Sequence, residues 1–386
     1  MFKADVTHQI DFEAATAELN QIFEWERFAV VAGARAQSGE FTTRSLLENP
    51  SRLAGLFSTP VAQAKITEDF RRVTGYGYFT LKPVDSLQLT AGLAYDDITF
   101  PENFRNPPIS AGQESRSQFS PKGAVVWTPL TSLTLRGIYA KSLGGATLDE
   151  SYRLEPAQLA GFPQAFRSLI SESVAGSVTA PGFEISGLAL DYKLGGRTFL
   201  GFTAENLESE VRRTVGFLTL HNSMRPIIDR PTREHLDYRE RSFNLSVSRL
   251  IGDEWALGAR YGLTRAELHT VWPGVPAAAV PDADRFEQTD LHHASLFVVF
   301  NHSSGFFARG ETDWYRQGNP SLGSAVPGDD VFQHHFFLGY RFLHRRAEAM
   351  FGILNLTDQD YRLSPLTLHS ELPRTRVFTA RLRFSF

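Results

Sequence analysis

The feature that most constrains this chain is an alternation of apolar and polar residues with a period of two, repeated along most of its length. Successive side chains of a strand point to opposite faces, so the pattern gives each strand one apolar and one polar face. Residues 87–96 and 255–264 follow it, and helical spacing is nowhere sustained over comparable lengths. The final segment shows it best, because one face carries Phe378, Ala380, Leu382, Phe384 and Phe386. The chain is therefore predicted to be all-β.

The connections between these segments alternate in length. The short ones are rich in turn formers or charge: Pro83–Ser86, Pro129–Ser132, Leu194–Arg197, Ile251–Glu254, His302–Gly305 and His344–Arg346. The long ones are polar, at 38–68, 98–118, 142–180, 216–233, 266–288, 318–330 and 362–372. Barrels of the outer membrane have short periplasmic turns and long extracellular loops. The pattern predicts a transmembrane antiparallel up-and-down β-barrel of about sixteen strands, most near the roughly 9 to 11 residues that cross a tilted bilayer.

Composition narrows the class of protein. A net charge of -4 argues against a nucleic-acid surface, and the absence of cysteine excludes disulfides and thiolate metal sites. No run approaches the roughly 20 apolar residues that a spanning helix needs. A soluble sandwich or propeller would also alternate, but aromatic residues near the strand ends favour lipid-facing girdles. These aromatic residues are Tyr139, Tyr192, Trp255, Tyr340, Phe384 and Phe386.

The C-terminal region resembles the closing hairpin of TonB-dependent receptors. The resemblance rests on an Asn-Leu-Thr-Asp motif with a following Tyr, on a Pro-Arg pair, and on an aromatic last strand that looks like an assembly signal. The motif residues are Asn355, Leu356, Thr357, Asp358, Tyr361, Pro373 and Arg374, and those of the last strand are Phe378, Leu382, Phe384 and Phe386. Two further segments are similar to the same family, Phe119–Leu143 with its Ser-Pro start and Leu154–Pro156 with its Leu-Glu-Pro. The resemblance covers the chain from about Asp69 onward.

This resemblance implies a transport barrel of the bacterial outer membrane that takes up a siderophore or another bulky nutrient. It implies membrane lipid and the barrel assembly machinery as partners, and the TonB complex through an N-terminal region not seen here. No plug-like region is recognisable, and about sixteen strands fall short of the family's roughly twenty-two. Residues 1–386 are therefore expected to be one barrel domain, a fragment without signal peptide and plug. A plugless porin, a polysaccharide or secretion exporter, and an outer-membrane hydrolase stay as alternatives.

The chemistry available to the lumen is mainly that of charged side chains. Polar inward residues set the selectivity of a wide barrel, and an excess of Arg favours anionic solutes, although ordinary ion-pair ladders would use the same residues. The candidates for the lumenal face are Arg136, Arg260, Arg309, Glu311, Asp313, Arg341, Arg381 and Arg383.

No enzyme, metal site or cofactor is expected. The pairs His292–His293 and His334–His335 cannot chelate alone, because neighbours on a strand point to opposite faces. One member of each pair could meet the other across strands in the lumen, but no carboxylate or cysteine spacing supports a metal site. The sequence also has no G-x-S-x-G, H-E-x-x-H, Walker A or strand-linked G-x-G-x-x-G motif.

Overall fold

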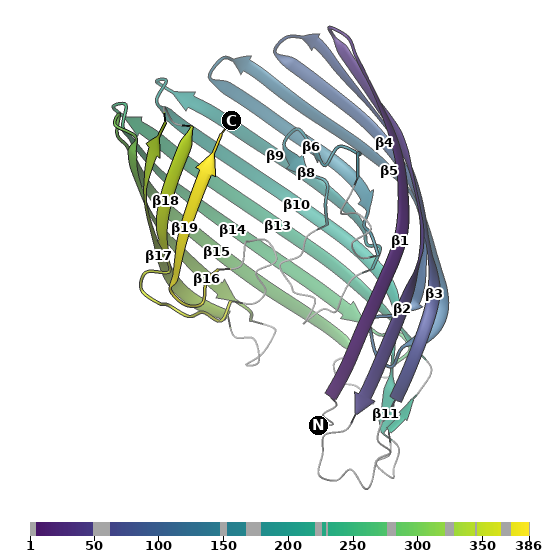
Figure 1. The fold of residues 1–386 in the computed structure, drawn as a ribbon. Helices are drawn as coiled ribbons and strands as arrows, with labels where there is room; N and C mark the ends of the chain where they lie inside the picture. Colours follow the sequence, from purple (N-terminus) through teal and green to yellow (C-terminus); the bar gives the residue numbers. More distant parts are fainter. Residues whose placement is uncertain are drawn as a thin grey trace.

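The fold is known from a computed structural model that describes residues 5–48, 62–146, 153–166, 179–220, 226–228, 231–275, 283–320, 328–343, 346–363 and 372–385. Every regular element in these ranges is a strand (Figure 1). Within them, no helix is long and apolar enough to cross a membrane. The strands are β1 (Asp5–Glu24), β2 (Phe28–Glu48), β3 (Ala62–Val84), β4 (Leu87–Asn103), β5 (Ser110–Leu130), β6 (Leu133–Leu143), β7 (Gln158–Leu159), β8 (Phe162–Pro163), β9 (Gly182–Leu194), β10 (Thr198–Val215), β11 (Leu218–Leu220), β12 (Pro226–Ile228), β13 (Thr232–Ile251), β14 (Trp255–Val271), β15 (Asp284–Asn301), β16 (Phe306–Gly318), β17 (Gly328–Phe342), β18 (Ala347–Leu354) and β19 (Val377–Phe384).

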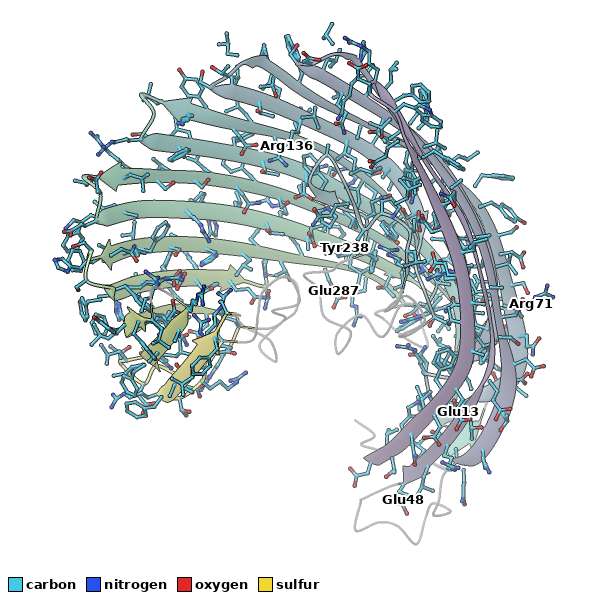
Figure 2. All side chains as sticks on the ribbon, turned by 45° about the horizontal axis from the view of Figure 1, so that its top comes forward. Glu13, Glu48, Arg71, Arg136, Tyr238 and Glu287 are labelled. Carbon is cyan, nitrogen blue, oxygen red and sulfur yellow. The ribbon has the colours of Figure 1, made fainter. Side chains whose placement is uncertain are left out.

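Fifteen of these strands form one sheet in which each strand pairs with the next one along the chain. All the pairs are antiparallel, so the sheet is an up-and-down meander, and the predicted all-β antiparallel class is confirmed. The other strands make two small hairpins, β7–β8 and β11–β12, within connections of the large sheet. Figure 2 shows the large sheet as a curved wall, with β1 and β19 at its two edges.

The predicted tight turns are found where expected, at the end of the sheet where the C-terminus lies (Figure 1). Gly195, Gly196 and Gly252 adopt positive φ angles of 57°, 77° and 60° there, a region that L side chains rarely occupy. A further turn at residues 25–27 joins β1 to β2 and was not predicted. Residues 344–345 of the last predicted turn lie outside the described residues.

The predicted strand lengths were wrong for much of the sheet, because β3 has 23 residues and β2 and β5 have 21. The extra length lies at the end opposite the tight turns, so much of 38–68, 98–118 and 266–288 is strand rather than loop. Beyond the apolar band the outward face of these strands becomes polar, as Ser38, Glu40, Thr42 and Arg44 of β2 show, while the inner face still carries buried apolar residues such as Phe41. Backbone pairing continues although the outward face is polar there, so the composition of these segments indicated a loop.

The outward face of the sheet carries an apolar band. Leu257 and Leu296 are 40% and 62% exposed although they lie within paired strands, a pattern that fits contact with lipid. Beyond the band the same face becomes charged, as Arg265, Glu267 and His269 show on β14. The aromatic residues predicted as girdles lie on this outward face, and Trp255 packs on Phe300 with 4.6 Å between ring centroids. Phe386 lies outside the described residues.

The inner face is more apolar than the sequence predicted. From β9 to β17, toward the loop end, it carries a buried cluster that includes Ile185, Leu207, Leu236 and Leu291. Two connections cover this cluster: Phe166 belongs to the β6–β9 connection, and Tyr361 and Leu363 belong to the β18–β19 connection. The loops therefore fold over the inner wall instead of extending only into solvent.

Candidate functional site

The most developed inward-facing feature is the part of the β6–β9 connection at residues 153–166, which we name the strap. It contains the β7–β8 hairpin and lies against the inner side of the wall, the side on which Arg136 and Tyr238 lie in Figure 2. Leu159 and Phe162 are buried in one cluster with side chains of β3, β4, β6 and β9. Apolar burial of this kind stabilises the docking of the strap against the inner wall.

A buried charged group anchors the start of the strap. The Glu155 carboxylate accepts hydrogen bonds from Lys122 Nζ at 2.8 Å and from the Tyr78 hydroxyl at 2.5 Å. The Lys122 and Glu155 side chains are only 4% and 9% exposed. Burial favours the protonated carboxyl and is the largest effect, yet the Lys122 ammonium, the Tyr78 hydroxyl and the Arg153 charge together outweigh it and lower the pKa of Glu155. We name these three residues the latch.

Further hydrogen bonds tie the strap to strands at both sides of the latch. Glu18 of β1 accepts from the Leu154 backbone N–H at 3.0 Å, and Asn20 donates to the Leu154 carbonyl at 3.2 Å. Arg136 of β6 donates to the Ala160 carbonyl at 3.0 Å. Gly161, which follows, has a φ of 84°, and a Cβ there would lie 2.2 Å from Arg136 Nη1. Glycine is therefore required at this contact.

The predicted lumenal charges are all placed on the inner face by the strand register, and most of them sit in ion pairs. Glu348 of β18 accepts from Arg341 at 2.9 Å and from Arg381 at 2.8 Å, which links three strands near the tight turns. Glu311 pairs with Arg309 at 2.6 Å, and Arg136 pairs with Asp191 at 2.9 Å. Two more arginines have other surroundings: Arg260 lies over the ring of Phe297, and the exposed Arg383 lies opposite Glu348 in register.

The histidine pairs divide between the two faces, as predicted. His292 and His334 lie outward, and His293 and His335 lie inward on either side of Asp313. The His293 Nε2 is 2.9 Å from one carboxylate oxygen, and the His335 Nε2 is 3.6 Å from the other.

The hydrogen bonds of His335 indicate which of its ring nitrogens carries the hydrogen. Its Nδ1 accepts the Asn355 backbone N–H at 3.1 Å, so the hydrogen of the neutral ring is on the nitrogen facing Asp313. Among the residues that the structure describes, no group of three His, Cys, Asp or Glu is placed to hold a metal ion.

The C-terminal motif residues organise the β18–β19 connection. The Asn355 side chain donates to the carbonyls of Gln359 and Pro373 at 2.9 and 3.0 Å and accepts from the Gln359 N–H at 2.8 Å. The Tyr361 hydroxyl donates to the Leu372 carbonyl at 2.8 Å, and Arg374 lies over the Tyr361 ring at 4.5 Å. These contacts fold the connection back on itself beside the inner wall.

The remaining motif residues are more peripheral. Asp358 accepts the Arg376 N–H at 2.6 Å, and Leu356 and Thr357 are exposed. On the last strand, Phe378, Leu382 and Phe384 all project outward and are strongly exposed. Sequence reasoning singled out Leu154–Pro156, but it gave no role to Glu155. In the sequence, the one signal for this contact was an acidic residue in a long connection, together with a lysine, Lys122, at an inward-facing strand position.

Comparisons with known proteins agree with this architecture. Residues 4–182 match the family model described as TonB dependent receptor-like, beta-barrel. The match includes Phe119–Leu143 and Leu154–Pro156, and the C-terminal motif lies beyond it. No curated protein sequence is significantly similar to the chain.

Solved structures with the same fold include three transporters or receptors. The first, described as "Copper transporter OprC", has a TM-score of 0.61 and 14% identity, over 99% of this chain and 58% of that one. The ferric-catecholate import receptor Fiu of Escherichia coli K12 has a TM-score of 0.54 and 13% identity, over 99% and 55%. The ferripyoverdine receptor of Pseudomonas aeruginosa has a TM-score of 0.53 and 11% identity, over 99% and 49%.

The wall, its outward apolar band and these matches define the class of protein. The chain is a β-barrel of the bacterial outer membrane with the fold of these transporters and receptors, and its residues 4–182, somewhat under half of the chain, match the TonB dependent receptor-like barrel family. It spans about half the length of the solved structures that it matches, between 49% and 58% for the three described above.

Proposed function

We propose that the chain forms the wall of a receptor that takes up a siderophore or another bulky nutrient across the outer membrane. The observation that carries this proposal is the length of the strands, because β2, β3 and β5 continue well beyond the apolar band. Such strands raise a wall above the membrane, and two connections fold over its inner side. A small-solute pore needs no wall of this height, whereas capture of a bulky ligand does.

The inner face also indicates the chemistry of the ligand. Near the tight turns it carries Arg260, Arg309, Arg341, Arg381 and Arg383, with Glu311 and Glu348 as their acidic neighbours. This excess of guanidinium groups favours a ligand with carboxylate or other anionic groups.

We further propose that residues 1–386 form one barrel domain that is part of a larger receptor. Among the described strands, β1 and β19 are the two edges of the sheet, and each pairs with one neighbour only. The matched proteins are about twice as long as this chain. Exposed sheet edges of this length are normally paired or covered. Coupling to TonB and insertion by the barrel assembly machinery belong to the same proposal.

The test is ligand binding by the chain folded in detergent micelles. The probes are copper(II), ferric citrate, a ferric catecholate and ferripyoverdine, and tryptophan fluorescence is the readout. Binding of one probe with a dissociation constant of about 1 μM or lower is expected. No binding, together with a large steady current in a planar bilayer, would replace the receptor by an open porin.

A further inference from the structure

We propose that Lys122 and Tyr78 form an anion-binding site on the inner wall, which the strap fills with its own carboxylate. A carboxylate-bearing ligand in the lumen would replace Glu155 there and release the strap. This inference rests on the proposed uptake function, since it assigns a ligand chemistry and a gating step to the same lumen.

The geometry supports a built site. Lys122 on β5 and Tyr78 on β3 direct an ammonium and a hydroxyl to the same oxygen of Glu155, at 2.8 and 2.5 Å. Lys122 also lies 3.0 Å from the Tyr78 hydroxyl, so the two donors are held together independently of the strap. Both belong to rigid strands, whereas Glu155 belongs to a connection, so the donors stay when the strap leaves.

Besides the buried side chains of Leu159 and Phe162, the strap is held by hydrogen bonds that can be exchanged. Arg136 binds a backbone carbonyl at Ala160, and Glu18 and Asn20 bind the backbone of Leu154. The Arg136 guanidinium also keeps its pairing with Asp191. Release of the strap would expose the cationic groups of Lys122 and Arg136 toward the lumen, where an anionic ligand could bind them.

Tethering sets the concentration at which exchange occurs. A carboxylate on the same chain has an effective concentration on the order of millimolar, so a free monocarboxylate competes poorly. A ligand with several carboxylates can contact Lys122 and the nearby arginines together. Exchange is therefore expected with polycarboxylates and not with neutral solutes.

The chain contains no cysteine, so one introduced thiol reports on the strap alone. Leu159→Cys places this thiol at a position that is 7% exposed. In folded chain, maleimide labelling should be slow, and Lys122→Met should accelerate it about tenfold or more, because Glu155 loses its buried partner. Citrate at about 10 mM or above should accelerate labelling of the chain that keeps Lys122, and sucrose should not.

The matched control is Lys141→Met, which removes an outward Lys–Glu pair of similar length, Lys141–Glu184 at 3.0 Å, and should leave labelling unchanged. Glu155→Gln serves as a second latch variant if Lys122→Met does not give heat-modifiable, folded protein. Equal labelling in all variants would overturn the latch. Release by Lys122→Met without any effect of citrate would overturn the ligand exchange. Labelling does not depend on uptake, so its outcome is separable from failure of the receptor proposal.

Discussion

The same three residue types meet twice in this molecule, once inside the wall and once outside. In the latch, Glu155 accepts from Lys122 and Tyr78, and on the outward face Glu184 accepts from Lys141 at 3.0 Å and Tyr139 at 3.1 Å. The inner Lys and Glu are 4% and 9% exposed, and the outer ones 36% and 44%. The partners are of the same types, although the inner pair shares one carboxylate oxygen at shorter distances, and the largest difference between the two sites is their burial.

The largest difference between the two sites is expected in the free energy of unfolding when the lysine of each site is replaced. Lys122→Met leaves a buried carboxylate without its cation, which should lower the free energy of unfolding by about 3 kcal/mol. Lys141→Met removes a solvated pair and should cost at most about 1 kcal/mol. Urea unfolding of both variants in the same detergent checks this, and equal losses would contradict the role assigned to burial.

A charge placed on the outward apolar band tests whether the outward face lies in lipid. Leu257→Arg, within the exposed apolar band, should cost about 2 kcal/mol in a lipid bilayer. Ala256→Arg points inward from the next position and should cost clearly less. The measurement is the unfolding free energy in vesicles, and a similar cost for both would mean that the outward face is not in lipid.

A variant of Asn355 tests whether the β18–β19 connection, like the strap, depends on buried polar contacts. Asn355→Ala removes the three side-chain hydrogen bonds to Gln359 and Pro373 and should destabilise the connection by about 1 to 3 kcal/mol. Thr357→Ala changes an exposed side chain and should have an effect within about 0.5 kcal/mol. Limited proteolysis between β18 and β19 reports the difference.

Acid should affect the inner site through Glu155. Its pKa is lowered in the folded chain, so its contribution to stability is present above the pKa of the unfolded state and is lost as pH falls through the folded value. Labelling of Leu159→Cys, expressed relative to labelling of the same variant unfolded in urea at the same pH, should therefore increase at pH values below the ordinary range of a glutamate carboxyl. The double variant Leu159→Cys/Glu155→Gln should lose this pH dependence of labelling. An unchanged pH dependence in the double variant would mean that another titrating group causes it.

The sequence predicted the features that depend on neighbours in the chain. Period-two alternation predicted the sheet, and residues such as Gly195 and Gly252 marked the tight turns. Beyond the apolar band the prediction failed, because the outward face that carries Glu40 and Arg44 is polar and the inner face mixes Phe41 with Thr43 and Ser45. The apolar–polar alternation is weak there, and pairing with β1 and β3 extends the strand.

The candidate site depends on register and on distant contacts, so the sequence predicted it only in part. Arg136 was expected to face the lumen, but its contact with Ala160 requires the strap to fold inward. The histidines divided between faces as strand geometry requires, whereas their meeting at Asp313 depends on the register of three strands. Glu155 and Lys122 are adjacent only in the folded wall.

The contact between Glu18 and Leu154 also has a consequence for the order of folding. Each long strand pairs with its neighbour in sequence, so the wall can grow by local hairpins. The strap instead joins residues 136 positions apart, and it can dock only after β1, β3, β5 and β6 have taken their places. Slippage of β1 by one residue would turn Glu18 to the outer face and leave Leu154 without this acceptor. Docking of the strap is thus a late event that reports correct assembly of the first part of the wall.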